Sequence, residues 1–402
     1  MGNLTVGVRK GCWSKLSGNN FSIGYPGMKI RKLDTKKRAD CNSFLGFPFR
    51  LYKDVPQWVP PLRSEMTFVM DQKKHPFYQH SLGDFFVVES ERSVLGTVAV
   101  LNNQIYNQYH HSKTSFFYYL DFVEDFQVAT LLLDTAIQWA KKQGSNLILG
   151  PKGFSRVNGS GMLVEGFQYP ATLGVPYNLP YYSGFLEKTG FVKDVDYFSG
   201  YLDRSSRYDP KVYSIADRVR QRESFWIKSF KNTHEMKKFI PEIERIHDEA
   251  FRGILDFQFY PSSPIEFEMM AKDIITIADP EIMKMIMRGD EVVGFIIIYP
   301  DVSEAVRKIK GRLFPLGWIT LLWAKYHSTL LSLNGIGILP KYQGLGSNAL
   351  LYVETEKVIR AKHYQKAEMI QVQEKNFRSK DDMESLGVQW VKRHRIYQKS
   401  IG

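Results

Sequence analysis

Residues Leu333–Arg360 have the sequence LNGIGILPKYQGLGSNALLYVETEKVIR, and the prediction of the fold starts from them. A short apolar run, Ile336–Leu339, predicts a buried strand, which Pro340 ends because it has no N–H to give a neighbouring strand. After a turn with two glycines, Ala349–Lys362 carries apolar residues at helical spacing. A strand, a glycine turn and a helix form a phosphate-binding arrangement, because the backbone can approach the ligand and the first helical N–H groups are unpaired. The helix end adds roughly half a positive elementary charge.

The composition favours a protein with substantial cores and an anionic partner. Hydrophobic residues make up 44% of the 402 residues, enough for the one or two domains expected at this length. The formal net charge of +12 indicates a phosphate-rich cofactor, a lipid surface or nucleic acid as partner. Nucleic acid is not expected, since there is no RNA-binding aromatic signature, zinc-finger spacing or long basic helix. No metal site is predicted, because His110-His111 has no matching acidic or cysteine partners.

The N-terminal region and the cysteines indicate the compartment. Cys12 and Cys41 could pair, but both lie in the polar N-terminal region, so a reducing, cytoplasmic compartment is expected. Residues 1–27 contain no continuous apolar core and are not a secretory signal. We predict that they form a disordered extension.

The rest of the chain repeats one order of elements with a period of about 200 residues. Leu95-Gly96 in a first hairpin corresponds to Val293-Gly294 in a second, and the helix Val128–Lys142 corresponds to Ala349–Lys362. Each half runs hairpin, strand, helix, strand, helix, strand. This order predicts an α+β fold, an α/β sandwich with a mixed sheet in each half.

The repeat suggests domain boundaries. We predict a disordered extension at 1–27, an N-terminal domain at 28–208, a charged linker at 209–223 and a C-terminal domain at 224–402 with an insertion at 302–329. Within the first domain, the prolines and aromatics of Phe47–Leu62 predict a packed loop.

The turn resembles the cofactor motif of the GNAT superfamily of N-acyltransferases, Gln/Arg-x-x-Gly-x-Gly/Ala, which opens a helix after a strand. In Gln343-Gly-Leu-Gly346-Ser-Asn348 the first and fourth positions fit and Asn348 departs at the sixth. Further on, Asn376 and Gly387 match the family pattern Asn-x-x-Ala-x-x-x-Tyr-x-x-x-Gly, with Met383 in place of the tyrosine.

The resemblance covers about Phe225–Gln398 well. It covers about Phe85–Leu202 only in outline, because the corresponding stretch of the first half, Asp121–Ala129, lacks the glycine turn. It implies two tandem GNAT-like domains, each a mixed, mostly antiparallel sheet flanked by helices, with a degenerate first domain. Tandem proteins of this sort occur in bacteria.

The resemblance also implies an acyl-CoA donor, either acetyl-CoA or a longer acyl-CoA. The N–H groups of the turn would hold the pyrophosphate, and the strand edge before it would pair with the pantetheine arm. The expected cofactor contacts are Gly337, Ile338, Leu339, Gln343, Gly344, Leu345, Gly346, Ser347, Asn348 and Asn376. The alternative is an ordinary glycine turn before a helix.

An amine acceptor needs a group that removes a proton. Its neutral form costs roughly 4–5 kcal/mol to reach near pH 7. Glu374 follows the strand Ala367–Gln373 and is the candidate base, with a solvated loop carboxylate as the alternative. In the family, the tyrosine at the position of Met383 often protonates the leaving thiolate, and methionine cannot donate a proton. Tyr397 is the candidate to replace it, with a buried structural tyrosine as the alternative.

The long glycine-rich segment Phe154–Asn178 and the residues beside it provide candidates for the acceptor site, since long loops are often functional. The candidate substrate contacts are Asn158, Glu165, Tyr177 and Tyr181. Packing of the aromatic rings would explain the tyrosines equally well.

The insertion 302–329 has a basic stretch followed by the apolar run Leu313–Trp323, which at about 11 residues is too short to span a bilayer. It suits the surface of an anionic membrane, a lid over an acyl chain, or a filled domain interface. We therefore expect a cytoplasmic N-acyltransferase, in peripheral contact with the inner membrane if the insertion binds lipid, that acylates a primary amine, for instance a sphingoid base. The alternative is a catalytically inactive CoA-binding or membrane-surface module.

Overall fold

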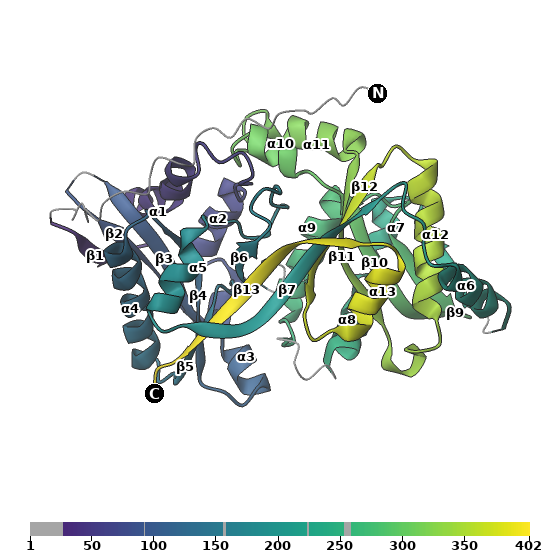
Figure 1. Ribbon diagram of the computed structural model, residues 1–402, viewed down its shortest axis with the longest axis horizontal. Helices are drawn as coiled ribbons and strands as arrows, with labels where there is room; N and C mark the ends of the chain where they lie inside the picture. The colour runs from purple at the N-terminus through teal and green to yellow at the C-terminus, as the bar shows by residue number, and fades with distance from the viewer. Residues whose placement is uncertain (1–26, 92, 156–157, 223–224, 253–258) are drawn as a thin grey trace, which may run out of the picture.

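The computed structural model describes residues 27–91, 93–155, 158–222, 225–252 and 259–402. The extension predicted at 1–27 lies outside this part except for Gly27, as does Cys12, and Cys41 is a free thiol. Figure 1 shows two halves side by side, each with its own strands and helices. Two long strands cross from one half to the other.

The first half contains the following elements: β1 (Lys29–Lys32), α1 (Arg38–Leu51), α2 (Arg63–Met70), the 3₁₀ helix η1 (Pro76–Gln79), β2 (Leu82–Glu89), β3 (Val94–Asn102), α3 (Gln104–Tyr109), β4 (Thr114–Phe122), α4 (Phe126–Lys142), β5 (Leu147–Gly150), β6 (Met162–Glu165), α5 (Tyr181–Lys188) and β7 (Val192–Asp203).

The second half contains α6 (Pro210–Arg222), β8 (Phe225–Ser229), α7 (Thr233–Lys237), α8 (Ile240–Arg252), α9 (Pro264–Ile277), β9 (Lys284–Arg288), β10 (Glu291–Pro300), α10 (Ser303–Lys308), α11 (Gly317–His327), β11 (Leu330–Ile338), the 3₁₀ helix η2 (Pro340–Tyr342), α12 (Ser347–Ala361), β12 (Lys366–Gln373), α13 (Phe377–Ser385) and β13 (Gln389–Ser400).

The described strands form one continuous mixed sheet, in the order β1-β2-β3-β4-β5-β13-β7-β12-β11-β10-β9-β8, with β6 beside β13. Two pairs are parallel, β4 with β5 and β11 with β12, and a helix connects the strands of each pair. The predicted α+β class and the mixed, mostly antiparallel sheets are therefore confirmed.

The two halves exchange their last strands. β7 pairs with β12 of the second half, whereas β13 pairs with β5 of the first. The C-terminus consequently lies in the first half, near α4 (Figure 1). The segment predicted as a domain at 224–402 thus gives its final strand to the first half, because the apolar residues of β13, such as Tyr397, complete that core.

The helices cover the sheet with apolar stripes. In α4, buried Val128, Leu132 and Ala136 recur at intervals of four residues and pack on the sheet of the first half. Burying a leucine side chain contributes roughly 1.5–3 kcal/mol. In α12, Leu350, Leu351 and other apolar residues pack into the core of the second half.

Two local predictions differ from the structure. The loop predicted at Phe47–Leu62 begins as helix, because α1 continues to Leu51 with Pro48 inside it. Buried Phe44, Phe47 and Pro48 face the core, and this packing outweighs the hydrogen bond that proline removes.

The segment predicted as a linker at 209–223 forms α6, which lies against α12. Val212, Ala216 and Val219 are buried at helical spacing, so the many charges of this segment occupy the outer face of an ordinary amphipathic helix.

Candidate functional site

The parallel strands β11 and β12 are paired only at their start. Their register runs from Leu330 opposite Lys366 to Leu333 opposite Met369, and no pairing between them continues beyond that point in the described residues. Both strands are irregular just past it: Asn334 is skipped where β11 pairs with β10, and Gln371 in β12 has φ +52°. The separation leaves an edge of β11 on which an extended ligand can lie.

The turn between β11 and α12 leads directly to this edge. Gln343, Gly344 and Leu345 are exposed, and Gly346 is the N-cap of α12 with φ +82°. No side chain caps α12, and the described residues offer no acceptor to the N–H groups of 344–348. Unpaired donors at the positive end of a helix are an anion site.

Gly346 also satisfies a packing requirement, since a Cβ there would come within 2.4 Å of Ile215 Cγ2 on α6. α6 thereby packs close beside the start of α12, while no protein atom other than those of its chain neighbours would lie within 4 Å of a Cβ at Gly344.

The first half does not share this open helix start. At α4, Asp125 is the N-cap, and its Oδ1 accepts from the N–H groups of Gln127 (2.7 Å) and Val128 (3.3 Å). A carboxylate in this position takes up the donors and repels phosphate. Of the two equivalent helices, only α12 begins with an open anion site.

Two predicted cofactor residues use their side chains within the protein. Asn348, the departure from the family motif, donates from Nδ2 to the carboxylate of Asp382 on α13, which also accepts from Tyr352 (3.1 Å). Asn376 is the N-cap of α13, and its Oδ1 accepts from the Ser379 N–H (3.2 Å). Both amides position α13 beside the turn.

The strand edge Gly337–Leu339, predicted to pair with pantetheine, already forms hydrogen bonds within the protein. Gln343 Nε2 donates to the carbonyl of Ile338 (2.9 Å), and the Leu339 N–H donates to Val293 O (2.9 Å). Gly337 packs tightly, since a Cβ there would lie 2.9 Å from the ring of Phe295. The part of β11 that precedes Ile338 is therefore the part of this edge that remains available for an extended ligand.

The structure does not bring the two candidate catalytic residues to the turn together. Glu374 is held by β7, where it accepts from Lys193 Nζ (2.6 Å) and from the Asp196 N–H (3.1 Å). Tyr397 lies in the core of the first half and donates to Glu187 (2.9 Å), because β13 crosses into that half. Burial raises the pKa of the Tyr397 hydroxyl far above its usual value.

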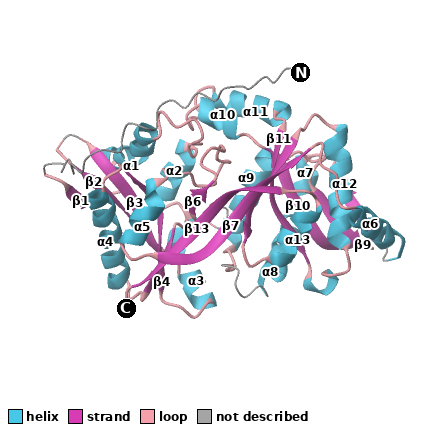
Figure 2. Cartoon of the chain, in the orientation of Figure 1, coloured by secondary structure: helices cyan, strands magenta, loops and turns pink. Residues whose placement is uncertain are grey.

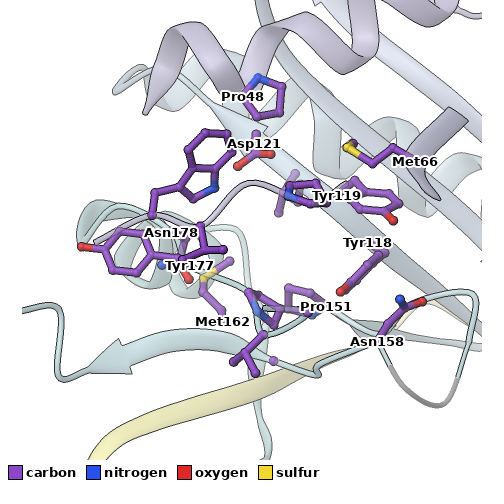
Figure 3. Close-up of a pocket in the computed structure, with 18 of the residues that line it drawn as sticks. Pro48, Met66, Tyr118, Tyr119, Asp121, Pro151, Asn158, Met162, Tyr177 and Asn178 are labelled. Atoms are coloured by element: carbon purple, nitrogen blue, oxygen red, sulfur yellow. The ribbon is translucent and has the colours of Figure 1, made fainter. Parts of the chain in front are cut away.

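A cavity of about 120 Å³ lies in the first half (Figure 3). It adjoins the part of β4 beyond its last pairing with β5, at Phe116 opposite Leu149. Tyr119, which lines the cavity, has φ +47°, a backbone strain that often accompanies function.

Two of the four predicted substrate contacts line this cavity, namely Asn158 and Tyr177. Glu165 instead pairs with Arg393, and Tyr181 donates to the carbonyl of Phe122 (2.6 Å). The cavity therefore draws on the glycine-rich segment and lies within the first half, and Asn158 and Tyr177 stay candidate substrate contacts.

Two acidic residues in the cavity wall escaped the sequence analysis. Asp121 Oδ1 accepts from Tyr52 Oη (2.5 Å) and Tyr182 Oη (3.5 Å), and burial raises the pKa of Asp121 to about 6. The removal of water, helped by the charge of Asp273, raises the pKa of Glu65 to about 7. More than a third of the surface of Glu65 is accessible, because the side chain faces the hollow. Protein atoms of the cavity wall lie around it. A lone acid in the apolar run of β4 was the available signal for Asp121.

A contact between the halves joins the cavity to the opening beyond β11. Gln371, in the irregular part of β12, accepts from the Ser160 N–H (2.8 Å) and donates from Nε2 to Ser160 O (2.6 Å). Asn158 and Gly161, on either side of Ser160 in the chain, line the cavity. The two features are thus adjacent along this loop.

No protein-family model matches the chain. Two relatives match nearly all of it. The chain is 26% identical over 387 residues to protein YghO of Escherichia coli K12, which covers 94% of this chain and 97% of that protein. It is 24% identical over 383 residues to the bacterial ceramide synthase of Caulobacter vibrioides, which covers 92% of this chain and 97% of that protein.

Solved structures of similar fold also cover almost the whole chain. A tandem GNAT protein from the clavulanic acid biosynthesis pathway superposes with a TM-score of 0.56 at 12% identity, over 93% of this chain and 99% of that one. A GCN5-related N-acetyltransferase from Sphaerobacter thermophilus gives a TM-score of 0.50 at 11% identity, over 93% and 96% of the two chains. The agreement in fold extends over both halves of the chain.

Proposed function

The chain has the fold of tandem GNAT-type acyltransferases, and on this premise we propose that it transfers an acyl group from an acyl-CoA to a primary amine. The single observation that carries the proposal is the open start of α12, beside a strand edge that its parallel neighbour has left. The diphosphate would lie on the N–H groups of the turn at Gly344–Asn348, and the pantetheine arm along β11.

The chemistry requires little from the protein beyond positioning and proton removal. The amine nitrogen forms a bond to the thioester carbonyl carbon, the carbon–sulfur bond breaks, and the thiolate accepts the proton that the nitrogen loses. Holding both reactants in reacting geometry lowers the barrier by several kcal/mol. Glu374 remains a candidate base only in a state in which it releases Lys193.

We expect purified protein to acylate at least one member of a panel of primary amines when given acetyl-CoA or a long-chain acyl-CoA. Mass spectrometry would detect the amide product, and an assay of free thiol would detect CoA. The panel should include sphingoid bases, because one relative is named a bacterial ceramide synthase. Binding of CoA without any product would favour the inactive module instead.

A second proposal concerns the insertion 302–329, whose helices α10 and α11 lie together at one edge of the molecule (Figure 2). Seven large apolar side chains here are between 45% and 88% exposed: Phe314, Leu316, Trp318, Ile319, Leu322, Trp323 and Tyr326. Soluble proteins rarely expose so many neighbouring apolar groups. Lys308, Lys310 and Arg312 are exposed close to them in the chain.

We propose that this surface rests on an anionic membrane, which would give the enzyme access to a lipid amine. In the described part of the chain, no helix has both the length and the apolar character needed to cross a bilayer. The proposed contact is peripheral, with the inner membrane and from its cytoplasmic side. Exposed tryptophans favour insertion at the boundary between lipid headgroups and acyl chains, and the nearby cations favour a membrane with anionic lipids.

The double variant Trp318→Ala/Trp323→Ala should reduce the vesicle-bound fraction about tenfold or more, because each lost side chain contributes roughly 1.5–3 kcal/mol of burial. Flotation with vesicles containing phosphatidylglycerol measures this fraction. Trp226→Ala is the matched control, since Trp226 is similarly exposed, at 46%, but lies on β8. Equal flotation of parent and double variant would contradict membrane contact through this surface.

A further inference from the structure

The cavity in the first half has a wall of two chemical kinds. Two carboxylates, Asp121 and Glu65, face a hollow otherwise formed largely by apolar and aromatic groups. The apolar lining residues include Trp58, Met66, Leu120, Met162 and Leu173. Among the described residues that line it, none is a lysine or an arginine. Such a wall favours a ligand with a positive charge and a hydrocarbon part.

Asp121 is arranged to accept a further hydrogen bond. Tyr52 and Tyr182 both contact Oδ1, and no described residue donates to Oδ2. Tyr52 is itself fixed, since its ring stacks on Trp58 with the centroids 4.9 Å apart. Glu65 forms no ion pair with a described residue, although it stands in the same wall. Neither acid forms an ion pair within the described part of the chain, and a carboxylate without a cationic partner is costly in a protein interior unless a ligand supplies one.

The size of the cavity limits what it can hold. A cavity of about 150 Å³ accepts a benzene molecule, so about 120 Å³ accommodates a comparable small group of roughly six heavy atoms. A longer chain would have to extend through the mouth. The loop that carries Asn158 and Gly161 contacts β12 through Ser160 and Gln371, so one loop joins the cavity wall to the strand beside the proposed donor site.

We propose that this cavity binds a small primary ammonium ligand, with the ammonium group facing the carboxylates of Asp121 and Glu65 and its first carbons against Trp58 and Met66. The inference stands apart from the proposed function, because it does not require the bound amine to be the acyl acceptor. Binding of an alkylammonium ion can be measured with no donor present, so the two ideas fail separately.

The test uses two probes of equal length, n-hexylamine and 1-hexanol, with the full chain at pH 7.5 and titration calorimetry supported by ligand-observed NMR. Hexylamine should bind at least about tenfold more tightly than hexanol, since an ammonium ion that pairs with the carboxylates of the cavity wall gains more than about 1.4 kcal/mol. Asp121→Asn should remove most of this difference and leave hexanol binding unchanged.

Glu187→Gln is the matched control, because Glu187 also accepts from a tyrosine hydroxyl, that of Tyr397, but does not line the cavity. It should retain the preference for the amine. Glu65→Gln provides a second variant, should Asp121→Asn fail to fold, because none of the described residues forms a hydrogen bond with the Glu65 side chain. It should weaken hexylamine binding several-fold. Equal binding of the two probes to the parent protein, or an amine preference that survives both cavity variants, would overturn the proposal. Amine binding without acyl transfer would leave it standing and remove the proposed function.

Discussion

Gly344→Asp is expected to raise the dissociation constant for CoA about 30-fold, equivalent to about 2 kcal/mol, and to lower kcat/KM for acyl transfer by a similar factor. Gly344 is exposed with φ +77°, and no protein atom beyond its chain neighbours would lie within 4 Å of an added Cβ. Asp tolerates this left-handed backbone better than most residues. The variant therefore adds a negative charge where the diphosphate should lie, as Asp125 does at α4 in the first half.

The controls separate charge from backbone strain. Gly344→Asn has nearly the same shape and no charge, and should lose only a few-fold in affinity. Gly289→Asp, in the hairpin between β9 and β10, also replaces an exposed glycine of positive φ (+55°) with open space around it. It should bind CoA as the parent does. Titration calorimetry with CoA measures all three, and parent-like affinity of Gly344→Asp would show that the diphosphate does not lie on this turn.

The elements whose stability is local were predictable from the sequence. Apolar spacing in Val128–Lys142 and Ala349–Lys362 predicted α4 and α12 to within two residues, because a helix facing one sheet needs such a stripe. The glycine turn before α12 was also predictable from local sequence. Both of its glycines have positive φ in the structure, a conformation that glycine adopts easily.

The exchange of β7 and β13 could not be predicted in this way. The alternation of apolar residues in β13 is equally compatible with either half of the sheet, so it indicates a strand but not its neighbours. This is why the sequence left Tyr397 open as either a proton donor or a structural tyrosine, whereas in the structure it lies in the core of the first half. Pairing over such long sequence separation depends on the whole fold.

The cavity was only partly predictable for a related reason. Its wall combines α1 and α2, the strand β4 and the segment 151–178, which lie far apart in the sequence. Composition drew attention to Asn158 and Tyr177 because the segment that contains them is long and glycine-rich. Nothing in the sequence around Glu65 distinguishes it from an exposed helical glutamate, and only the fold places it at the hollow.

Lys392→Met is expected to destabilise the protein by about 3–5 kcal/mol, the usual cost of leaving one partner of a buried ion pair alone. Lys392 on β13 and Glu368 on β12 lie on either side of β7, with Nζ and Oε1 2.5 Å apart and each side chain only 2% exposed. Lys392 also donates to the carbonyl of Pro170 (2.9 Å), which precedes the cavity-lining residues Leu173–Asn178 in the chain. Urea unfolding followed by circular dichroism would measure the loss.

The double variant Lys392→Met/Glu368→Leu should regain most of this stability, because an apolar pair of similar volume avoids the cost of burying charge. The pH dependence offers an independent check. Burial raises the pKa of Glu368 even with Lys392 present, and removing the lysine raises it further. A carboxyl with a raised pKa in the folded state favours the folded state more as pH falls, toward the unfolded value of about 4.3. The penalty of Lys392→Met should therefore be smaller at pH 5 than at pH 8, whereas a penalty independent of pH would mean that lost packing, and not the unpaired carboxylate, causes it.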